Sequence, residues 1–422
     1  MQKQTWTRSL VIGSIGLALV GCSTKAQSGS DSSGEAGSVK TGVGVTDDTI
    51  TLGVLSDLSG PFKSGGLAFN TGHQIWLDEV NKAGGVCGRK IALDIQDHGY
   101  KADNAVPQYE IMRNKDLGLI QLLGTPVLAA IKTKIDSDQM LTTVQSVASN
   151  SLDTKSLISV TAPYDIEAIN GLSYQFEKGT LKDGNTFGAV YIDNEAGQNM
   201  LSGAKAFAKQ HDMQVVESAI GANDTDMTAL VTKLKSAGVK VVYTGASSAA
   251  TTSLAVQMKS QGLDVPLVGG SPTFAPTMLA NAETLSALKD IYYVSTSTPP
   301  WTIETPSAEK VRAAYAAMNV TDPPSPKVFA GYLSGMLWQS ILEHACTSGD
   351  LTRGGVHTAL ENLGKIDADG LSGTIDVSEP GAPTTRESYV LQLDENVEGG
   401  LTKVGDLKAS EEAKKYKAPY EK

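Results

Sequence analysis

The sequence predicts an α/β fold built from parallel sheets, and three observations point to it. Short apolar runs rich in Ile, Leu and Val alternate with stretches whose apolar residues recur at helical spacing. The runs are apolar throughout, as expected of strands that are covered on both faces. Glycine and proline stand where the elements end. For 422 residues, two doubly wound lobes fit the length better than one sheet or a barrel, although the pattern alone excludes neither.

The first expected elements are a strand and a helix, and strands and helices continue to alternate along the rest of the chain. Residues 50–58, ITLGVLSDL, indicate a buried strand that closes in Ser-Gly-Pro. A helix is expected over about 68–83, and Gly84-Gly85 ends it because glycine tolerates the left-handed conformation of a helix cap. Further strands are expected at 90–95, 117–124, 186–192, 240–245 and 290–296, and further helices at 103–114, 197–211 and 249–261.

The loops that follow these strands are the places to look for a binding site. Ligands of doubly wound sheets bind beyond the carboxyl ends of the strands. Most residues in these loops are small, polar or glycine, although loops favour such residues in any case. The loops concerned are 59–66, 124–128, 146–150, 193–197, 269–273 and 296–301.

The beginning of the chain has the features of an exported protein. Lys3 and Arg8 come before or at the edge of an apolar stretch that is shorter than the roughly 20 residues of a membrane-spanning helix, which predicts a secretory signal peptide. The sequence LVGC that ends at Cys22 resembles the lipobox of bacterial lipoproteins, in which the cysteine thiol is acylated. We therefore expect a signal peptide at 1–21, a lipid on Cys22 and a flexible linker at 22–47, with a buried core cysteine as the alternative.

Composition and motifs favour binding over catalysis. A net charge of −11 without any basic block does not suit nucleic acid. The sequence has no G-x-S-x-G, P-loop, H-E-x-x-H or C-x-x-C motif, and its five histidines are scattered. We therefore expect no catalytic residues, no metal site and no cofactor, and an extracellular hydrolase on this scaffold is disfavoured.

A specific family resemblance begins at the first predicted strand. The chain has SGP at 59–61, DEVN at 78–81, GGV at 84–86 and GR at 88–89. In residue type and spacing, these motifs resemble the start of the type I periplasmic binding proteins of the leucine/isoleucine/valine-binding branch. A weaker, colinear similarity continues over nearly the whole body and includes a last long helix at 331–345.

The resemblance implies two lobes that are joined by three crossovers and close over a small ligand. Lobe one would hold 48–145 and 300–370, and lobe two 146–299 and 371–422. The crossovers would lie near 124–128 or a little beyond, near 295–301 and near 370–374. The implied function is that of a lipid-anchored monomer on the outer face of the cell membrane, which passes its ligand to an ABC permease. A ligand-sensing surface receptor with the same fold is the alternative.

The resemblance also implies where a ligand would be held. In the family, main-chain N–H groups and a hydroxyl from two lobe-one loops hold a carboxylate, and Ala148 and Ser149 match one of those loops. The acid that commonly pairs with an α-ammonium falls near Gly270-Ser271, which has no carboxylate. A small carboxylate without an amine, aromatic carboxylates included, therefore rivals an amino acid as ligand. With the strand-end loops, the candidate ligand-binding residues are Ser64, Gly65, Thr125, Leu128, Ser146, Ala148, Ser149, Glu195, Ala196, Ser271, Trp301 and Tyr332.

Two of the three cysteines remain once Cys22 is assigned to a lipid. The family fold places both Cys87 and Cys346 in lobe one, and an exported chain meets an oxidising environment. We therefore expect them to form a disulfide, which would tie the late return of the chain to its beginning. Two buried free thiols are the alternative.

Overall fold

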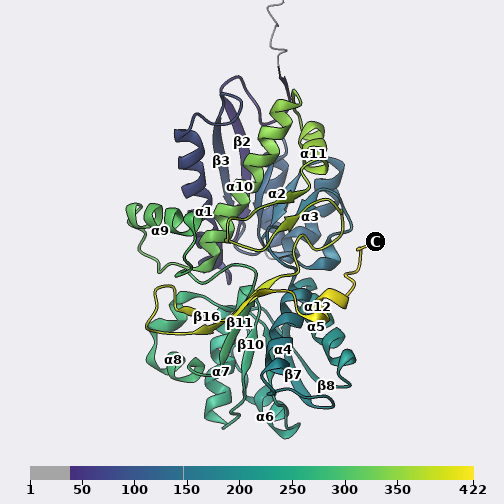
Figure 1. Ribbon diagram of the computed structural model, residues 1–422, viewed down its shortest axis with the longest axis vertical. Helices are drawn as coiled ribbons and strands as arrows, with labels where there is room; N and C mark the ends of the chain where they lie inside the picture. The colour runs from purple at the N-terminus through teal and green to yellow at the C-terminus, as the bar shows by residue number, and fades with distance from the viewer. Residues whose placement is uncertain (1–38, 146) are drawn as a thin grey trace, which may run out of the picture. The chain divides into compact units, whose positions relative to one another are not determined.

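Two separate sheets organise the chain in the computed structural model, which describes residues 39–145 and 147–422. The signal peptide expected at 1–21, Cys22, most of the expected linker and Ser146 lie outside the described residues. Figure 1 shows the two sheets in an upper and a lower lobe. We call them lobe one (residues 39–158 and 301–377) and lobe two (residues 164–296 and 388–416).

Lobe one is built around a five-stranded parallel sheet in the order β3-β2-β4-β5-β6. Its strands are β2 (Thr49–Ser56), β3 (Lys90–Asp97), β4 (Gly118–Leu122), β5 (Thr142–Val144) and β6 (Leu157–Ile158). Its helices are α1 (Lys63–Lys82), α2 (Ala102–Met112), α3 (Thr125–Ser137), α9 (Pro306–Ala317), α10 (Pro326–Thr347) and α11 (Arg353–Glu361). Two small pairs complete it, β1 (Lys40–Thr41) with β12 (Asp350–Leu351), and β13 (Lys365–Ile366) with β14 (Ile375–Asp376).

Lobe two contains a seven-stranded sheet in the order β16-β15-β11-β10-β9-β7-β8. Its parallel strands are β7 (Thr186–Ile192), β8 (Gln214–Ile220), β9 (Val242–Gly245), β10 (Leu267–Gly269) and β11 (Tyr292–Thr296). The antiparallel strands β15 (Ser388–Leu393) and β16 (Leu401–Lys408) extend the β11 edge. Its helices are α4 (Tyr164–Glu177), α5 (Glu195–Gln210), α6 (Thr228–Ser236), α7 (Ser248–Ser260), α8 (Ala282–Leu288) and α12 (Glu411–Lys415).

Helices cover both faces of each sheet, so each lobe has two cores. In lobe one, α1 and α10 bury one face, and α2 with α3 bury the other. In lobe two, α4 and α5 cover one face, while α6, α7 and α8 cover the other. The expected α/β class with two parallel-sheet lobes is thereby confirmed, and the strands read from the apolar runs lie within a few residues of the observed ones.

Glycines let α1 and α10 approach each other closely enough to form the spine of lobe one. A Cβ on Gly72 would lie 2.1 Å from the carbonyl oxygen of Val328, and one on Gly331 would lie 2.1 Å from that of Phe69. No larger residue fits at either position without moving a backbone. This contact fixes the start of α10 beside the start of α1, and both starts face lobe two (Figure 1).

The chain passes between the lobes three times, at about 159–163, 297–300 and 378–387. The first crossing lies further along the chain than expected, because Gly124 and Pro126 begin helix α3 instead of a linker, and β6 still pairs in the first sheet. Ser297 joins all three crossings. Its buried hydroxyl accepts from the Ala162 N–H at 2.8 Å and donates to the Glu387 carbonyl at 2.9 Å.

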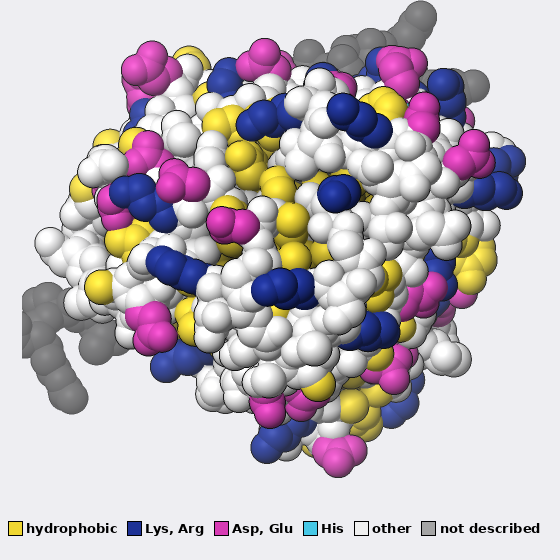
Figure 2. Space-filling view, turned by 90° about the horizontal axis from the view of Figure 1, so that it is seen from below, with side chains coloured by type: hydrophobic (Ala, Val, Ile, Leu, Met, Phe, Trp, Pro, Cys, Tyr) yellow, Lys and Arg dark blue, Asp and Glu magenta, His cyan; other side chains and the backbone are white. Residues whose placement is uncertain are grey.

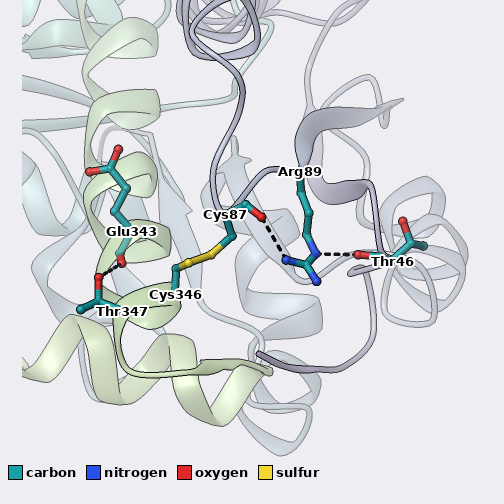
Figure 3. The surroundings of a disulfide bond; sticks show 6 residues. All are labelled: Thr46, Cys87, Arg89, Glu343, Cys346 and Thr347. Carbon is teal, nitrogen blue, oxygen red and sulfur yellow. Dashed lines mark hydrogen bonds between the residues drawn. A yellow bond between two sulfur atoms is a disulfide. The ribbon is translucent and has the colours of Figure 1, made fainter. Parts of the chain in front are cut away.

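The disulfide expected between Cys87 and Cys346 is confirmed (Figure 3). The two Cα atoms are 6.0 Å apart, within the usual range for a bridge. Arg89 supports the loop that carries Cys87, because its guanidinium donates to the Cys87 carbonyl at 3.2 Å and to the Thr46 carbonyl at 2.7 Å. The bridge therefore joins the end of α10 to the loop after α1.

The surface carries no strong concentration of one charge on the face shown in Figure 2. Lysines and arginines are interspersed there with aspartates and glutamates, and apolar side chains show through near the middle. Within the part of the chain that the structure describes, none of the helices combines the length and apolarity needed to cross a bilayer. The same residues contain no group of three His, Cys, Asp or Glu side chains placed to hold a metal ion.

Candidate ligand-binding cleft

A cavity lies where strand ends of both sheets meet. It encloses about 530 Å³, counting the space that opens to solvent. Its lobe-one wall consists of Phe62, Gly65, Phe69, Tyr100, Leu123, Gly124, Thr125 and Lys327. Its lobe-two wall consists of Tyr164, Ile192, Asn194, Ala196, Met200, Gly245, Ala246 and Pro272. A second cavity of about 590 Å³ lies beside β6 and α11, away from the converging strand ends.

The loop after β2 places an aromatic side chain in this cleft. The buried carboxylate of Asp57 accepts from the Gly60 N–H at 2.5 Å and from the Phe62 N–H at 2.8 Å, which folds the Ser-Gly-Pro segment into a turn. Phe62 then packs on Tyr100, with ring centroids 4.7 Å apart. The Ser-Gly-Pro motif therefore serves to present an apolar surface to the cleft.

A polar contact between the lobes closes one part of the cleft. The Asn194 side-chain amide donates to the Tyr100 hydroxyl at 3.3 Å, while its oxygen caps helix α5 by accepting from the Gly197 N–H at 3.0 Å. Burial raises the pKa of Tyr100 to about 12, further above neutral pH than that of an ordinary tyrosine. The Tyr100 side chain is thus a neutral hydrogen-bonding group in the cleft between the lobes.

Several helices begin at the cleft. The first residues of α3 and α4, Thr125 and Tyr164, line it, as do Ala196 near the start of α5 and Lys327 near the start of α10. Gly124 precedes α3 with φ of +111° and has no capping side chain, which leaves the helix end accessible. Helix N-termini carry partial positive charge, so this arrangement favours an anionic group in the cleft.

Two ionisable groups beside the cleft were missed by the sequence reasoning. Lys327 lines the cleft, and its ammonium donates to the Phe274 carbonyl at 2.7 Å. Glu167 is completely buried in α4 and accepts from both the Ser271 N–H at 2.9 Å and the Ser271 hydroxyl at 3.0 Å. Burial raises the pKa of Glu167 to about 8, so the carboxyl is mostly neutral at pH 7.

This glutamate changes the interpretation of the segment around Ser271. The sequence there has no carboxylate, but the middle of α4 supplies one from about a hundred residues earlier in the chain. Its position could not be read from the chain order, because it depends on how α4 packs against the sheet of lobe two. Because it is neutral and already bound to Ser271, it is a poor partner for an ammonium ion.

The structure brings only some of the candidate residues together. Gly65, Thr125 and Ala196 line the cleft. Three others lie close in sequence to lining residues but outside its wall: Ser64 borders a smaller pocket, Glu195 is exposed, and Ser271 contacts Glu167. Ser146 lies outside the described residues.

The remaining candidates are buried in the interior. Leu128 and Ala148 belong to apolar cores, and Trp301 stacks on Phe329 with ring centroids 4.8 Å apart. Tyr332 is buried, and its hydroxyl donates to Glu79 at 2.7 Å outside the cleft wall. Ser149 lies in a buried network with Asn199 and Asp165. The strand-end rule found four loops that line the cleft, at 59–66, 124–128, 193–197 and 269–273, but it missed Phe69, Tyr100, Tyr164 and Lys327.

The comparison with known families settles what kind of protein this is. A family described as periplasmic binding protein matches residues 49–400. The chain belongs to this family. Its members are ligand-binding proteins and not enzymes, so the expectation of binding without catalysis is confirmed, and membership places the protein outside the cytoplasm.

Solved structures are similar to the chain as well. The fatty acid ABC transporter substrate-binding protein from Thermomonospora curvata is 34% identical, with a TM-score of 0.87 over 90% of this chain and 97% of that one. A branched chain amino acid ABC transporter structure from Thermus thermophilus with bound valine is 17% identical, with a TM-score of 0.75 over 88% and 99% of the two chains, and shows the fold.

A curated relative matches part of this chain. The Leu/Ile/Val-binding protein homolog 3 of Brucella melitensis is 28% identical over 201 residues, which cover 46% of this chain and 54% of that one. The chain thus spans about half the length of the curated relatives it matches.

Proposed function

We propose that this protein is the substrate-binding component of an ABC importer, tethered to the membrane by a lipid on Cys22, and that its ligand is a carboxylate with a substantial apolar body. The observation that carries the ligand class is the composition of the cleft wall. Ten of its sixteen residues are aromatic or aliphatic, counting proline, while its one side chain with a full charge is the ammonium of Lys327. An apolar body would bury against such a wall, and an anionic head would meet positive charge.

The same wall is unfavourable for a free amino acid. An α-ammonium needs an ionised carboxylate or several acceptor oxygens, and the cleft wall contains no aspartate or glutamate. Glu167 behind it is neutral and bound to Ser271. The similarity to a protein whose name specifies fatty acids supports the same choice. Among the expected ligands, the carboxylate without an amine is therefore favoured over the amino acid.

Binding measurements on the full chain in lipid nanodiscs test this proposal, with empty discs as the blank for ligand partitioning. The panel consists of octanoate, an aromatic carboxylate such as 4-hydroxybenzoate, and leucine. We expect saturable binding of at least one carboxylate and at least tenfold weaker binding of leucine. Preferential binding of leucine, or no saturable binding of any panel member, would contradict the ligand class.

Transport is tested separately in cells. Deleting the gene should abolish ATP-dependent uptake of the bound carboxylate, and the intact gene should restore it. A Cys22→Ala variant should be found outside the membrane fraction or remain unprocessed, because the lipid-accepting thiol is missing. Binding without any effect on uptake would favour the sensing receptor over the importer component.

A further inference from the structure

Lys327 reaches from one lobe to the other inside the cleft. It is the second residue of α10, where the Ser325 hydroxyl caps the helix by accepting from the Lys327 N–H at 3.3 Å. Its side-chain stem runs beside α1, since a Cβ on Gly65 would lie 3.3 Å from the lysine Cδ. Its ammonium then meets the Phe274 carbonyl of lobe two at 2.7 Å. A residue larger than glycine at position 65 would crowd this path.

The charge of Lys327 has no counter-charge in direct contact. Lys327 forms no ion pair with any carboxylate of the described chain within 4.0 Å. An ammonium has three N–H donors, and the Phe274 carbonyl takes one of them. The nearest acid that influences it, Glu167, is mostly neutral because burial raises the pKa of its carboxyl to about 8. A partly buried cation with free donors therefore faces an apolar cavity.

Holding the Lys327 ammonium in the cleft without a counter-charge costs free energy, and a bound anion would reduce this cost. Removing an ammonium from water without a paired charge is unfavourable, and burial indeed lowers the pKa of Lys327 to about 8. A ligand carboxylate would accept the remaining donors and supply the missing charge. Neighbouring Phe62, Phe69 and Leu123 would remain free to pack on an apolar body.

We infer that Lys327 binds the anionic head of the ligand and makes this receptor selective for acids over neutral or cationic molecules of the same shape. This inference deepens the proposed function and rests on it. The carboxylate lies at the start of α10, between the Lys327 ammonium and lobe two, so that the head group contacts both lobes at once. The contact with the Phe274 carbonyl is retained or exchanged for the ligand.

The test compares ligands that differ only in the head group, on the full chain in nanodiscs with empty discs as the blank. Octanoate carries the charge, whereas 1-octanol and methyl octanoate have the same chain without it. The wild-type protein should bind octanoate roughly 10- to 100-fold more tightly than either neutral ligand, the difference expected of a charged hydrogen bond. Equal affinities in the wild type would overturn the inference without any variant.

Variants assign the effect to the lysine. Lys327→Met keeps the apolar stem and should weaken octanoate binding by roughly 10- to 100-fold while changing 1-octanol binding less than threefold. Lys327→Arg should keep most of the preference for the acid. Lys63→Met is the matched control, because Lys63 begins α1 in the same lobe but is exposed and outside the cleft wall.

The outcomes separate the inference from the proposed function. If Lys327→Met binds octanoate as tightly as the wild type, the lysine is not the head-group residue, although the receptor still takes carboxylates. If octanoate and 1-octanol lose affinity equally, the lysine has only a structural role and the inference is wrong. If the wild type binds leucine and no carboxylate, the proposed ligand class itself fails.

Discussion

The two lobes share an architecture, but they hold themselves together differently and present different surfaces to the cleft. Lobe one is stapled by the Cys87–Cys346 disulfide and packs three tryptophans, Trp76, Trp301 and Trp338, into one core. Its cleft wall contains bulky side chains and Lys327. Lobe one therefore provides shape and charge.

Lobe two has a different interior. Its helix α4 buries Asp165, Glu167 and Asn170, which are held by hydrogen bonds to neighbouring segments. Its cleft wall combines the small residues Ala196, Gly245 and Ala246 with Tyr164, Ile192 and Met200, and it contains no charged side chain. The comparison teaches that both halves of a site can supply apolar surface while one half alone supplies its charge.

Removing the disulfide should lower the free energy of unfolding more than any other change considered, and the loss should arise in lobe one. The bridge closes a loop with a sequence separation of 259 residues, and the Cys87→Ser/Cys346→Ser variant should lose about 4 kcal/mol of unfolding free energy. Urea unfolding followed by tryptophan fluorescence measures this, because the three tryptophans of the described chain lie in lobe one. A loss below about 1 kcal/mol would show that the disulfide does not stabilise lobe one substantially.

The next largest effect concerns the buried acid of lobe two. Folded Glu167 has its pKa raised to about 8 from an ordinary value of 4.5, so its stabilising effect is fully present below pH 4.5 and is lost as the pH rises towards 8. Between pH 5 and pH 8, the wild type should lose on the order of 3 kcal/mol relative to Glu167→Gln. Chemical unfolding of both proteins at each pH measures this difference, and Asp116, also raised in pKa, cancels because it is common to both. A constant difference would show that Glu167 is ionised throughout.

A smaller effect is expected from the network between the lobes. Asn199 donates to the Ser149 hydroxyl at 2.9 Å and to Asp165 at 3.1 Å, and its oxygen accepts from both backbone N–H groups at 3.2 Å. Asn199→Ala should cost about 2 kcal/mol because it leaves buried polar groups without partners. Thermal unfolding measures this, and the neighbouring exposed Gln198→Ala should stay within about 0.5 kcal/mol of the wild type. Equal effects would mean that the network contributes nothing specific.

The smallest effect should come from the crossings. Ser297→Ala removes the two hydrogen bonds that join the three segments and should cost about 1 kcal/mol. It should also widen the distribution of lobe separations, which small-angle scattering of the unliganded protein measures. Ser202→Ala, on the exposed side of α5, is the control and should change neither property. An unchanged scattering profile for Ser297→Ala would show that the serine does not restrain the lobes.

The sequence was informative wherever structure depends on local pattern. Apolar runs such as 186–192 give the observed strand β7, and Gly84-Gly85 ends α1 with both residues at positive φ. The cysteine pair was accessible because an exported family fold puts both residues in one lobe. The family motifs identified the loop at 59–66, where Asp57 organises the turn.

The residues that escaped prediction depend on how distant segments pack. Glu167 reaches Ser271 only because α4 lies against the second sheet, and nothing in the sequence around either residue shows this. Lys327 follows a proline-rich segment that looks like an ordinary helix start. Trp301 follows a strand, and for that reason the sequence predicted it to bind ligand. The second crossing between the lobes instead directs its side chain into the core of lobe one.

The antiparallel pair β15–β16 has a consequence for the order in which the protein is assembled. Both strands come from the last part of the chain, yet β15 covers the edge of β11 in a sheet whose other members end near residue 296. While the chain is being exported, the edge of β11 therefore stays unpaired until β15, which ends at residue 393, has also emerged. Open edges invite pairing with other chains. Until β15 is added, the β11 edge of the lobe-two sheet is therefore open to pairing with other chains.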